Sequence, residues 1–268
     1  MITISVIDGN YSLMLHRHIN IKNVLIRTFL PYGAWRRVLR GPAKGMKFMV
    51  EPGMGLSYLI GSSAAAPRFF ANHIQPGSTV FDVGANKGQM SLIFASLVGD
   101  RGGVISFEPA PREFTSLKRN IVANDLNHVH CVESAAGAIE GSANFVYYPA
   151  LPTQGGFRHL ERAEISCAAE ELSVAIMPLD KMLLTGAAPD VIKIDVEGSA
   201  SEVLQGAKEI LKSARPKIYI ELHNSQESSA LNSILKPLGY RFQTQEGKVI
   251  DDPTLQYHYS LWCLPCTD

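Results

Sequence analysis

The sequence predicts an α/β protein with a doubly wound, mostly parallel sheet that helices cover on both faces. Short apolar runs that suit buried strands alternate with segments in which apolar residues recur at helical spacing. One such run, Val80 to Val83, leads into two glycines, Gly84 and Gly88, and then into a helical pattern. Several later runs end in titratable residues. Because α/β proteins bind ligands at the carboxyl ends of parallel strands, these observations predict a cofactor site at one edge of the sheet.

Composition sets the broad class of the protein. The 268 residues, of which 46% are hydrophobic, suit one ordinary α/β domain with an N-terminal extension. The 25 Lys and Arg residues balance 25 Asp and Glu residues. No whole-chain field therefore attracts nucleic acid or an anionic membrane, and we expect no nucleic-acid partner. The oligomeric state does not follow from these numbers, although a homodimer is compatible with them.

The cysteines indicate the compartment. Cys131, Cys167, Cys263 and Cys266 are too few and too scattered for a disulfide framework, so we expect a reducing, cytoplasmic environment. The last two form a lone C-x-x-C without a second ligand pair. This pattern fits a terminal strand better than a zinc or redox site.

Residues 1–56 are predicted to be an N-terminal extension, and residues 57–268 the cofactor-binding domain. Residues 1–40 alternate apolar with basic side chains, which predicts a helical lead-in whose basic end includes Arg36 and Arg37. Such a helix usually presents a solvated face, and peripheral contact with a membrane surface is the alternative. The segment lacks a signal-peptide pattern, and the chain has no apolar stretch of about 20 residues that would span a membrane.

The glycine turn carries the first functional signal. Gly84 and Gly88 allow the backbone to turn with positive φ and let a ligand lie close to the N–H groups of the following helix. The second strand, residues 103–107, ends in Glu108, which is placed to accept hydrogen bonds from ribose hydroxyls. Asp82, just before the turn, disfavours a pyrophosphate. It suits a cofactor that carries an amine or a sulfonium, namely S-adenosylmethionine.

The remaining elements follow in the same alternation. Residues 134–137, which are Ser-Ala-Ala-Gly, come after the third strand, where small side chains would let an adenine lie against the backbone. An insertion at about residues 142–180 interrupts the alternation and is expected to form strands near the acceptor pocket. Elsewhere we expect strands at residues 46–50, 129–133, 190–194, 217–223, 239–244 and 260–264, and helices at 56–73, 114–122, 203–211 and 231–235.

Two strand tips gather titratable groups. The strand that begins at Asp190 contains Lys193, for which we expect an internal salt bridge, and ends near Asp195 and Glu197. The next strand ends near Glu221 and His223. Groups of this kind at adjacent strand tips are candidates for catalysis.

Five segments resemble, in order and spacing, the FkbM family of S-adenosylmethionine-dependent methyltransferases. They are VFDVGANKG at 80–88, ISFEP at 105–109, DVIKIDVEG at 190–198, VLQGA at 203–207 and PKIYIELH at 216–223. The resemblance implies a class I methyltransferase, Rossmann-like fold with a seven-stranded sheet and one antiparallel edge strand. It also implies methyl transfer to a hydroxyl of a sugar, a glycan or glycolipid, or a secondary metabolite.

Carried over by position, the resemblance assigns the cofactor site. The motif at 82–88 would line the methionine end, Glu108 the ribose and Ala135 the adenine edge, whereas Ala138 stands where the family often has an acid. The predicted cofactor-binding residues are Asp82, Gly84, Ala85, Asn86, Gly88, Glu108, Pro109, Ser134, Ala135 and Asp195.

The predicted catalytic residues are His223, Asp195 and Glu197. A hydroxyl acceptor needs a base. His223 is the first candidate, because an unperturbed histidine has a pKa near 6.5, and Asp195 could orient it or act as base itself. A divalent metal such as Mg²⁺, held by Asp195, Glu221 and His223, is the less favoured alternative. Two further readings stay open: an NAD(P)-dependent oxidoreductase with a Rossmann-type domain, and a non-catalytic cofactor-binding module. Asn86 in place of a close-approach glycine disfavours the oxidoreductase.

Overall fold

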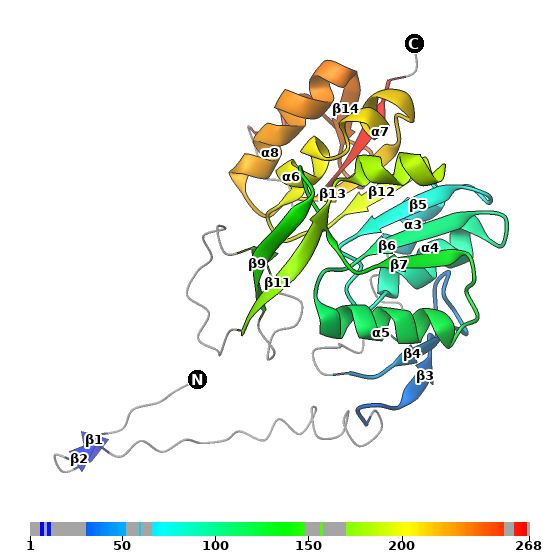
Figure 1. Cartoon of the computed structure of the whole chain (residues 1–268), viewed down its shortest axis with the longest axis vertical. Coiled ribbons are helices and arrows are strands. Elements are labelled where there is room, and N and C mark those ends of the chain that lie inside the picture. Colours follow the sequence, from blue (N-terminus) through cyan, green and yellow to red (C-terminus); the bar gives the residue numbers. More distant parts are fainter. Residues whose placement is uncertain are drawn as a thin grey trace.

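A central eight-stranded sheet organises the molecule (Figure 1). The computed structural model describes residues 6–7, 10–11, 31–51, 59, 66–147, 156–157, 170–254 and 260–266. In the sheet the strands follow the order β15-β14-β16-β13-β12-β5-β6-β7. Their bounds are β5 Thr79–Val83, β6 Gly103–Phe107, β7 Val129–Val132, β12 Val191–Ile194, β13 Lys217–Glu221, β14 Tyr240–Gln243, β15 Val249–Ile250 and β16 Ser260–Pro265.

The strand directions confirm the predicted fold class. β5, β6, β7, β12 and β13 pair in parallel, and β16 pairs antiparallel with both β13 and β14. The antiparallel strand is therefore not the edge strand that the sequence predicted, because β14 pairs with its outer side and two-residue β15 adds to β14. Cys263 is buried within β16 and Cys266 is exposed at its end, as the terminal-strand interpretation required.

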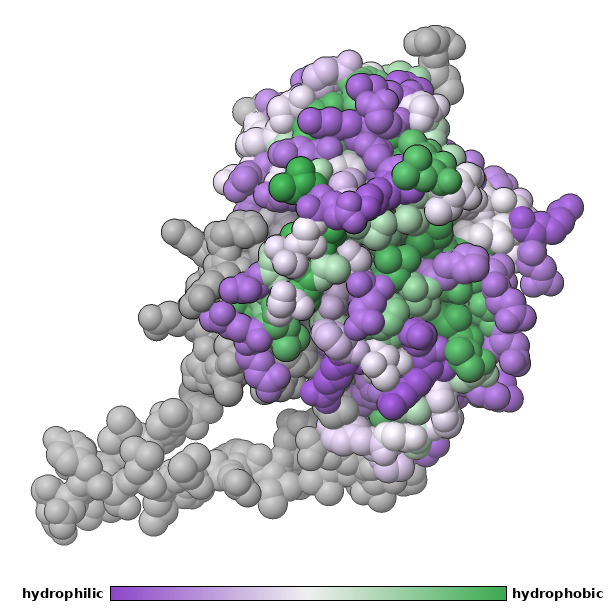
Figure 2. Space-filling model, in the orientation of Figure 1, coloured by the Kyte–Doolittle hydropathy of each residue, from purple (hydrophilic) through white to green (hydrophobic). Residues whose placement is uncertain are grey.

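Helices cover both faces of this sheet. One face carries α3, α4 and α5, and the other carries η1, α6, α7, α8 and the short helical turns η2 and η3. Hydrophilic residues dominate much of the outer surface (Figure 2). No helix in the described part of the chain is long and apolar enough to cross a membrane. The bounds are α3 Ala66–Ala71, α4 Gln89–Val98, α5 Pro111–Val122, η1 Leu179–Thr185, α6 Ala200–Gln205, α7 Lys208–Ser213, α8 Ser225–Ala230, η2 Leu231–Leu235 and η3 Lys236–Leu238.

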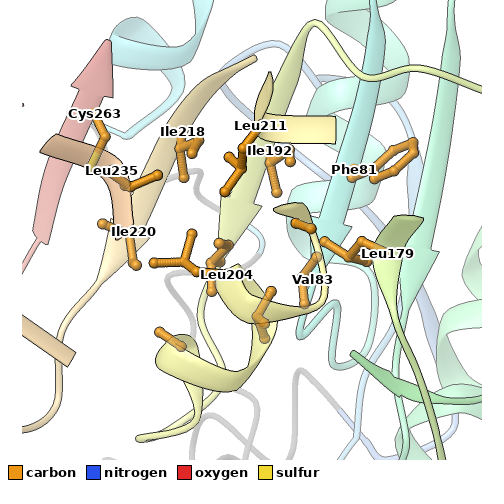
Figure 3. Close-up of a cluster of buried hydrophobic side chains, with 14 of the residues drawn as sticks. Phe81, Val83, Leu179, Ile192, Leu204, Leu211, Ile218, Ile220, Leu235 and Cys263 are labelled. Atoms are coloured by element: carbon orange, nitrogen blue, oxygen red, sulfur yellow. The ribbon is translucent and has the colours of Figure 1, made fainter. Parts of the chain in front are cut away.

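Alternation along the strands builds the two core layers. Phe81 and Val83 of β5 point to the face covered by α6 and α7, whereas Val80 points to the face covered by α4 and α5. Ile192 and Ile218 of the neighbouring strands join the first layer (Figure 3). Such strands are buried on both faces, which explains why they read as nearly continuous apolar runs.

The predicted insertion forms a second, smaller sheet. Its strands follow the order β10-β9-β11-β8, and β9 and β11 project from the end of the central sheet (Figure 1). Most of the loop between them lies outside the described residues. The bounds are β8 Ala135–Ala136, β9 Gly141–Tyr147, β10 Gly156–Phe157 and β11 Glu170–Met177.

The N-terminal part differs from its prediction. Trp35–Arg37 forms strand β3 and pairs antiparallel with β4, Lys47–Met49, so the basic end of the expected helix is a hairpin. Two-residue strands β1 and β2, Val6–Ile7 and Asn10–Tyr11, also replace helix. The remainder of residues 1–30, and much of the helix expected at 56–73, lie outside the described residues. The division of the chain at residue 56 stays a prediction.

The helix predicted at 203–211 is interrupted. It divides into α6 and α7 around Gly206 and Ala207. A Cβ atom at Gly206 would clash with the backbone carbonyl of Gly137 and lie 3.2 Å from the Cα of Pro178. Gly206 therefore lets two backbone segments touch, and a larger residue would separate them.

We predict that Gly206→Ala lowers the free energy of unfolding by about 1–3 kcal/mol, because the added methyl group forces backbone atoms apart. Gly103→Ala is the matched control, since its Cβ would meet nothing closer than the carbonyl oxygen of His128 at 4.0 Å. The control should change stability by no more than about 1 kcal/mol. Urea denaturation measures both, and equal stability of the two variants would contradict the prediction.

Candidate functional site

The glycine turn after β5 is built as the sequence predicted. Gly84, Asn86 and Gly88 all have positive φ, at 79°, 50° and 87°. The N–H groups of Gly84 and Ala85 donate to the carbonyl of Phe107, which fixes the turn to the end of β6. Gly88 caps the start of α4. The first backbone N–H groups of α4, which have no partner within the helix, lie at the turn. The turn therefore has the left-handed backbone and the helix terminus that a bound cofactor requires.

Glu108 braces the same turn. Its Oε2 accepts the Asn86 N–H at 2.8 Å, and its Oε1 accepts the Ala110 N–H at 2.9 Å. Burial raises the pKa of the Glu108 carboxyl to about 7, although the two backbone N–H groups act in the opposite direction. Each carboxylate oxygen keeps a second lone pair, so Glu108 can hold the turn and still accept a ribose hydroxyl.

Asp82 lies beneath the turn instead of in direct reach of a ligand. It is fully buried, its Oδ2 accepts the Ser91 hydroxyl at 2.7 Å, and its Oδ1 lies 3.3 Å from Nζ of Lys193. This corrects the expectation that Asp82 lines the methionine end directly. The reason is strand geometry: Asp82 is the residue before the end of β5, and its side chain points into the layer between the sheet and α4, where Ser91 lies.

Lys193 joins the end of β5 to the end of β12. Its Nζ donates to the carbonyl of Gly84 at 2.8 Å and lies 3.5 Å from Oδ2 of Asp195. Burial alone would lower the pKa of Lys193, but the carboxylates of Asp82, Asp195 and Glu221 outweigh it and hold the pKa above its ordinary value. Lys193 is therefore a buried cation shared by two carboxylates, as the sequence predicted for this residue.

Small residues line the stretch where an adenine was expected. Ala135 and Ala136 form β8, which pairs in parallel with the end of β11. The hydroxyl of Ser134 donates to the carbonyls of Ala135 and Ala175, and Ser134 and Ala135 are both buried. Pro109 is half-buried after β6. Apart from Asp82, which lies within β5, and Asp195, which follows β12, the predicted cofactor residues follow the ends of β5, β6 and β7, the three adjacent strands at one side of the sheet.

Asp195, Glu197 and His223 come together beyond the ends of β12 and β13. One ligand atom from each lies within 4.8 Å of the others, and all three side chains are partly exposed. His223 Nε2 is 3.8 Å from Oδ1 of Asp195. Glu197, and not Glu221, completes the group that could hold a divalent metal among the described residues, which corrects the ligand set predicted from sequence. Glu221 is the last residue of β13, two positions before the group's histidine.

The cluster adjoins the cofactor turn. A Cβ atom at Gly84 would clash with the backbone carbonyl of Asp195, so the two backbones are in contact. The Asp195 N–H also donates to the carbonyl of Val83 at 3.1 Å. Anything held against the glycine turn therefore lies beside the carboxylate and imidazole groups.

Glu227 is a supporting residue that the sequence reasoning missed. It is fully buried, and its Oε2 accepts the His223 N–H at 2.6 Å and lies 3.7 Å from Nδ1 of the same residue. Its Oε1 accepts the N–H of Ala200 at the start of α6. The spacing Asn224-x-x-Glu227 was the available signal, because it is a helix-capping pattern and Asn224 does cap α8.

Three carboxylates act on the imidazole of His223. Burial alone would lower its pKa, but contact with Glu227 and the charges of Glu197 and Asp195 outweigh that effect and raise the pKa above the ordinary value. The same contacts hold the pKa of Glu227 below its usual range in spite of burial. His223 is therefore a stronger base than a free histidine.

The chain is similar in sequence to a known family and to known proteins. Residues 82–242 match the Methyltransferase FkbM domain family. The 31-O-demethyl-FK506 methyltransferase FkbM of Streptomyces tacrolimicus is 29% identical over 56% of this chain and 67% of its own. Methyltransferase 1 of Beauveria bassiana is 22% identical, over 61% of this chain and 72% of its own length.

A solved structure resembles the chain as well. The methyltransferase FkbM of Methylobacillus flagellatus superposes with a TM-score of 0.46 and 17% identity, over 79% of this chain. The chain spans 56% of the length of that structure.

We predict that Lys193→Met lowers the free energy of unfolding by about 3–5 kcal/mol, because it leaves the buried Asp82 without its cation. Lys181→Met is the matched control, since Lys181 pairs with Glu140 at the exposed surface. That change should cost at most about 1 kcal/mol. Chemical denaturation at neutral pH compares the two. Equal small losses would show that the buried pair does not stabilise the fold.

Proposed function

The chain belongs to the FkbM methyltransferase family, and on this premise we propose that it transfers a methyl group from S-adenosylmethionine to a hydroxyl oxygen. The observation that carries the proposal is the backbone contact between Gly84 in the cofactor turn and Asp195 in the acid and histidine cluster. It brings a methyl donor and a proton acceptor to one place. Methyl transfer from a sulfonium is an in-line displacement, so this proximity is the main requirement.

The cofactor would lie across the ends of β5, β6 and β7. The turn from Gly84 to Gly88 would hold the methionine end, Glu108 the ribose hydroxyls, and Ala135 would lie against the adenine. Asp82 supports the turn from beneath through its ion pair with Lys193. A Rossmann-type NAD(P) site is the alternative that the sequence left open, and membership of a methyltransferase family argues against it.

His223 would remove the proton from the acceptor hydroxyl. A raised pKa makes it a better proton acceptor, and Asp195 and Glu227 on its two nitrogen sides stabilise the imidazolium that forms. The neutral imidazole is the active form of a base. The rate of the chemical step should therefore rise with pH through the raised pKa and level off above it.

A divalent cation such as Mg²⁺ is the second candidate at this place. Asp195 and Glu197 supply the oxygen ligands that Mg²⁺ prefers, and His223 completes the group. A bound cation would lower the pKa of a coordinated hydroxyl. We favour the metal-free base because His223 lies between Asp195 and Glu227, whose charges stabilise the imidazolium that forms when it accepts a proton.

The acceptor would be a sugar, glycan or secondary-metabolite hydroxyl. The Streptomyces relative is named as a methyltransferase of 31-O-demethyl-FK506, and this supports an oxygen acceptor. We propose that the second sheet, through β9 and β11, shapes the acceptor side. The catalytic domain would extend over residues 57–268, as expected from sequence.

We predict that Glu108→Ala weakens the binding of S-adenosylmethionine by roughly 1–3 kcal/mol, because ribose hydroxyls lose a charged acceptor. Wild-type affinity should also fall as the pH drops below about 7, since Glu108 then becomes protonated. Glu133→Ala removes an exposed acid after the next strand and is the control. Isothermal titration measures affinity for S-adenosylmethionine, with NAD⁺ and NADP⁺ as comparison ligands. Tighter binding of NAD⁺ or NADP⁺ would contradict the proposal.

We predict that His223→Gln lowers kcat by about 10²–10⁴ and removes the acid limb of the pH profile, while cofactor binding is retained. Gln keeps the size of the side chain but accepts no proton. Initial rates with and without EDTA separate the two candidates. If chelation silences the wild type and added Mg²⁺ restores it, the metal version is correct. If His223→Gln keeps full kcat and EDTA does not change the rate of the wild type, both the histidine base and the metal are ruled out.

A further inference from the structure

Large apolar side chains are exposed on the β3–β4 hairpin. Tyr32, Trp35 and Leu39 are 52%, 39% and 59% exposed, whereas Phe48 on the opposite face is buried in the core. The register explains this, because Trp35 pairs with Met49 and Arg37 with Lys47 on one face, while Arg36 pairs with Phe48 on the other. The hairpin is thus anchored by one face and presents the other to its surroundings.

The same hairpin concentrates positive charge. Residues 31–50 contain five cations and no acid, in a chain whose formal net charge is zero. The cations are Arg36, Arg37, Arg40, Lys44 and Lys47. All five are exposed or half-exposed. A neutral whole-chain charge therefore conceals a strongly basic segment.

Helix α5 extends this surface. The N–H groups of Lys47 and Met49 donate to the side chains of Asn124 and Asn120, at 2.7 and 3.0 Å, so β4 lies along the helix. Figure 1 shows the hairpin next to α5, at the opposite end of the molecule from α8. The exposed residues of α5 include three more cations, Arg112, Lys118 and Arg119, and Val122 at 72% exposure.

Acids are few around the hairpin surface, which we define as residues 31–50 with the exposed side of α5. Asp125, just beyond α5, is exposed. Glu51 is half-buried and accepts the hydroxyl of Ser116, and Glu113 is buried. Figure 2 shows hydrophilic and hydrophobic residues intermixed on the face that carries α5.

We propose that the hairpin surface docks on an anionic phospholipid bilayer. Trp and Tyr side chains favour the headgroup level of a membrane, and an exposed Leu can enter the acyl boundary. Each Lys or Arg near such a surface strengthens binding by about fivefold. Aliphatic Leu39 favours lipid over single-stranded nucleic acid, because bases stack on aromatic rings and gain little from aliphatic groups.

The docking surface is joined to the cofactor turn. The side chain of Asn120 accepts the N–H of Met49 and donates to the carbonyl of Lys87, which lies within the turn. A bilayer bound to the hairpin would therefore lie near the cofactor site and bring a lipid-borne hydroxyl acceptor within reach. The docking itself stands on residues outside that site and does not depend on the proposed function.

The test is co-sedimentation of the full chain with vesicles. One set is made of phosphatidylcholine alone and the other of equal parts phosphatidylcholine and phosphatidylglycerol. The charge variant is Arg40→Glu with Lys44→Glu, and its matched control is Arg101→Glu with Lys208→Glu, two exposed cations elsewhere. The apolar variant is Leu39→Ser. A single-stranded RNA oligonucleotide is the competing anionic probe.

We expect binding to the anionic vesicles alone, lost by at least about thirtyfold in the charge variant and retained in its control. Leu39→Ser should weaken binding by about tenfold, and binding should fall as ionic strength rises. The inference is overturned if the wild type ignores anionic vesicles, or if both double variants lose binding equally. RNA binding that is tighter than vesicle binding and unaffected by Leu39→Ser would also overturn it.

Discussion

The ammonium group of Lys193 is the interaction on which the site depends. It lies between Asp82 at the end of β5 and Asp195 after β12, and it donates to the backbone of Gly84. A charge buried without partners would be far too costly, so these three groups must stay where they are while the sheet is intact. The glycine turn and the cluster of Asp195, Glu197 and His223 are thus parts of one electrostatic unit, although more than a hundred residues separate Gly84 from Asp195 along the chain.

Local patterns explain what the sequence could predict. The strand before Gly84, the acid at the tip of β6 and the strand tip at Asp195 are each readable within a few residues, because burial and turn chemistry act locally there. The burial of Asp82 was not readable, since it depends on Ser91 and Lys193 from two other elements. The same holds for the metal ligand set, where distances between strand tips place Glu197 and not Glu221 beside His223.

Long-range contacts account for the other differences. A continuous apolar pattern predicted one helix at 203–211, but Gly206 touches Gly137, and this contact divides the segment. At the N-terminal end, alternating apolar and basic residues suited a helix. Residues 35–37 instead form a strand that pairs with β4, and this pairing places Phe48 of β4 in the core. Tertiary burial overrides local preference in both places.

The backbone at the cluster carries strain. Glu197 has a φ of 51°, which is unusual for a residue other than glycine, and Gly198 follows with a φ of 105°. A left-handed residue of this kind costs of order 1–3 kcal/mol and persists only where its surroundings hold it. Here the side chain of Asn224 donates to the carbonyl of Gly198, and Glu227 fixes both Ala200 and His223. A relaxed turn would carry the Glu197 carboxylate away from the imidazole. The contacts at the start of α8 therefore offset the strain at Glu197 and keep its carboxylate beside His223. Both proton transfer and cation binding require a carboxylate at that place.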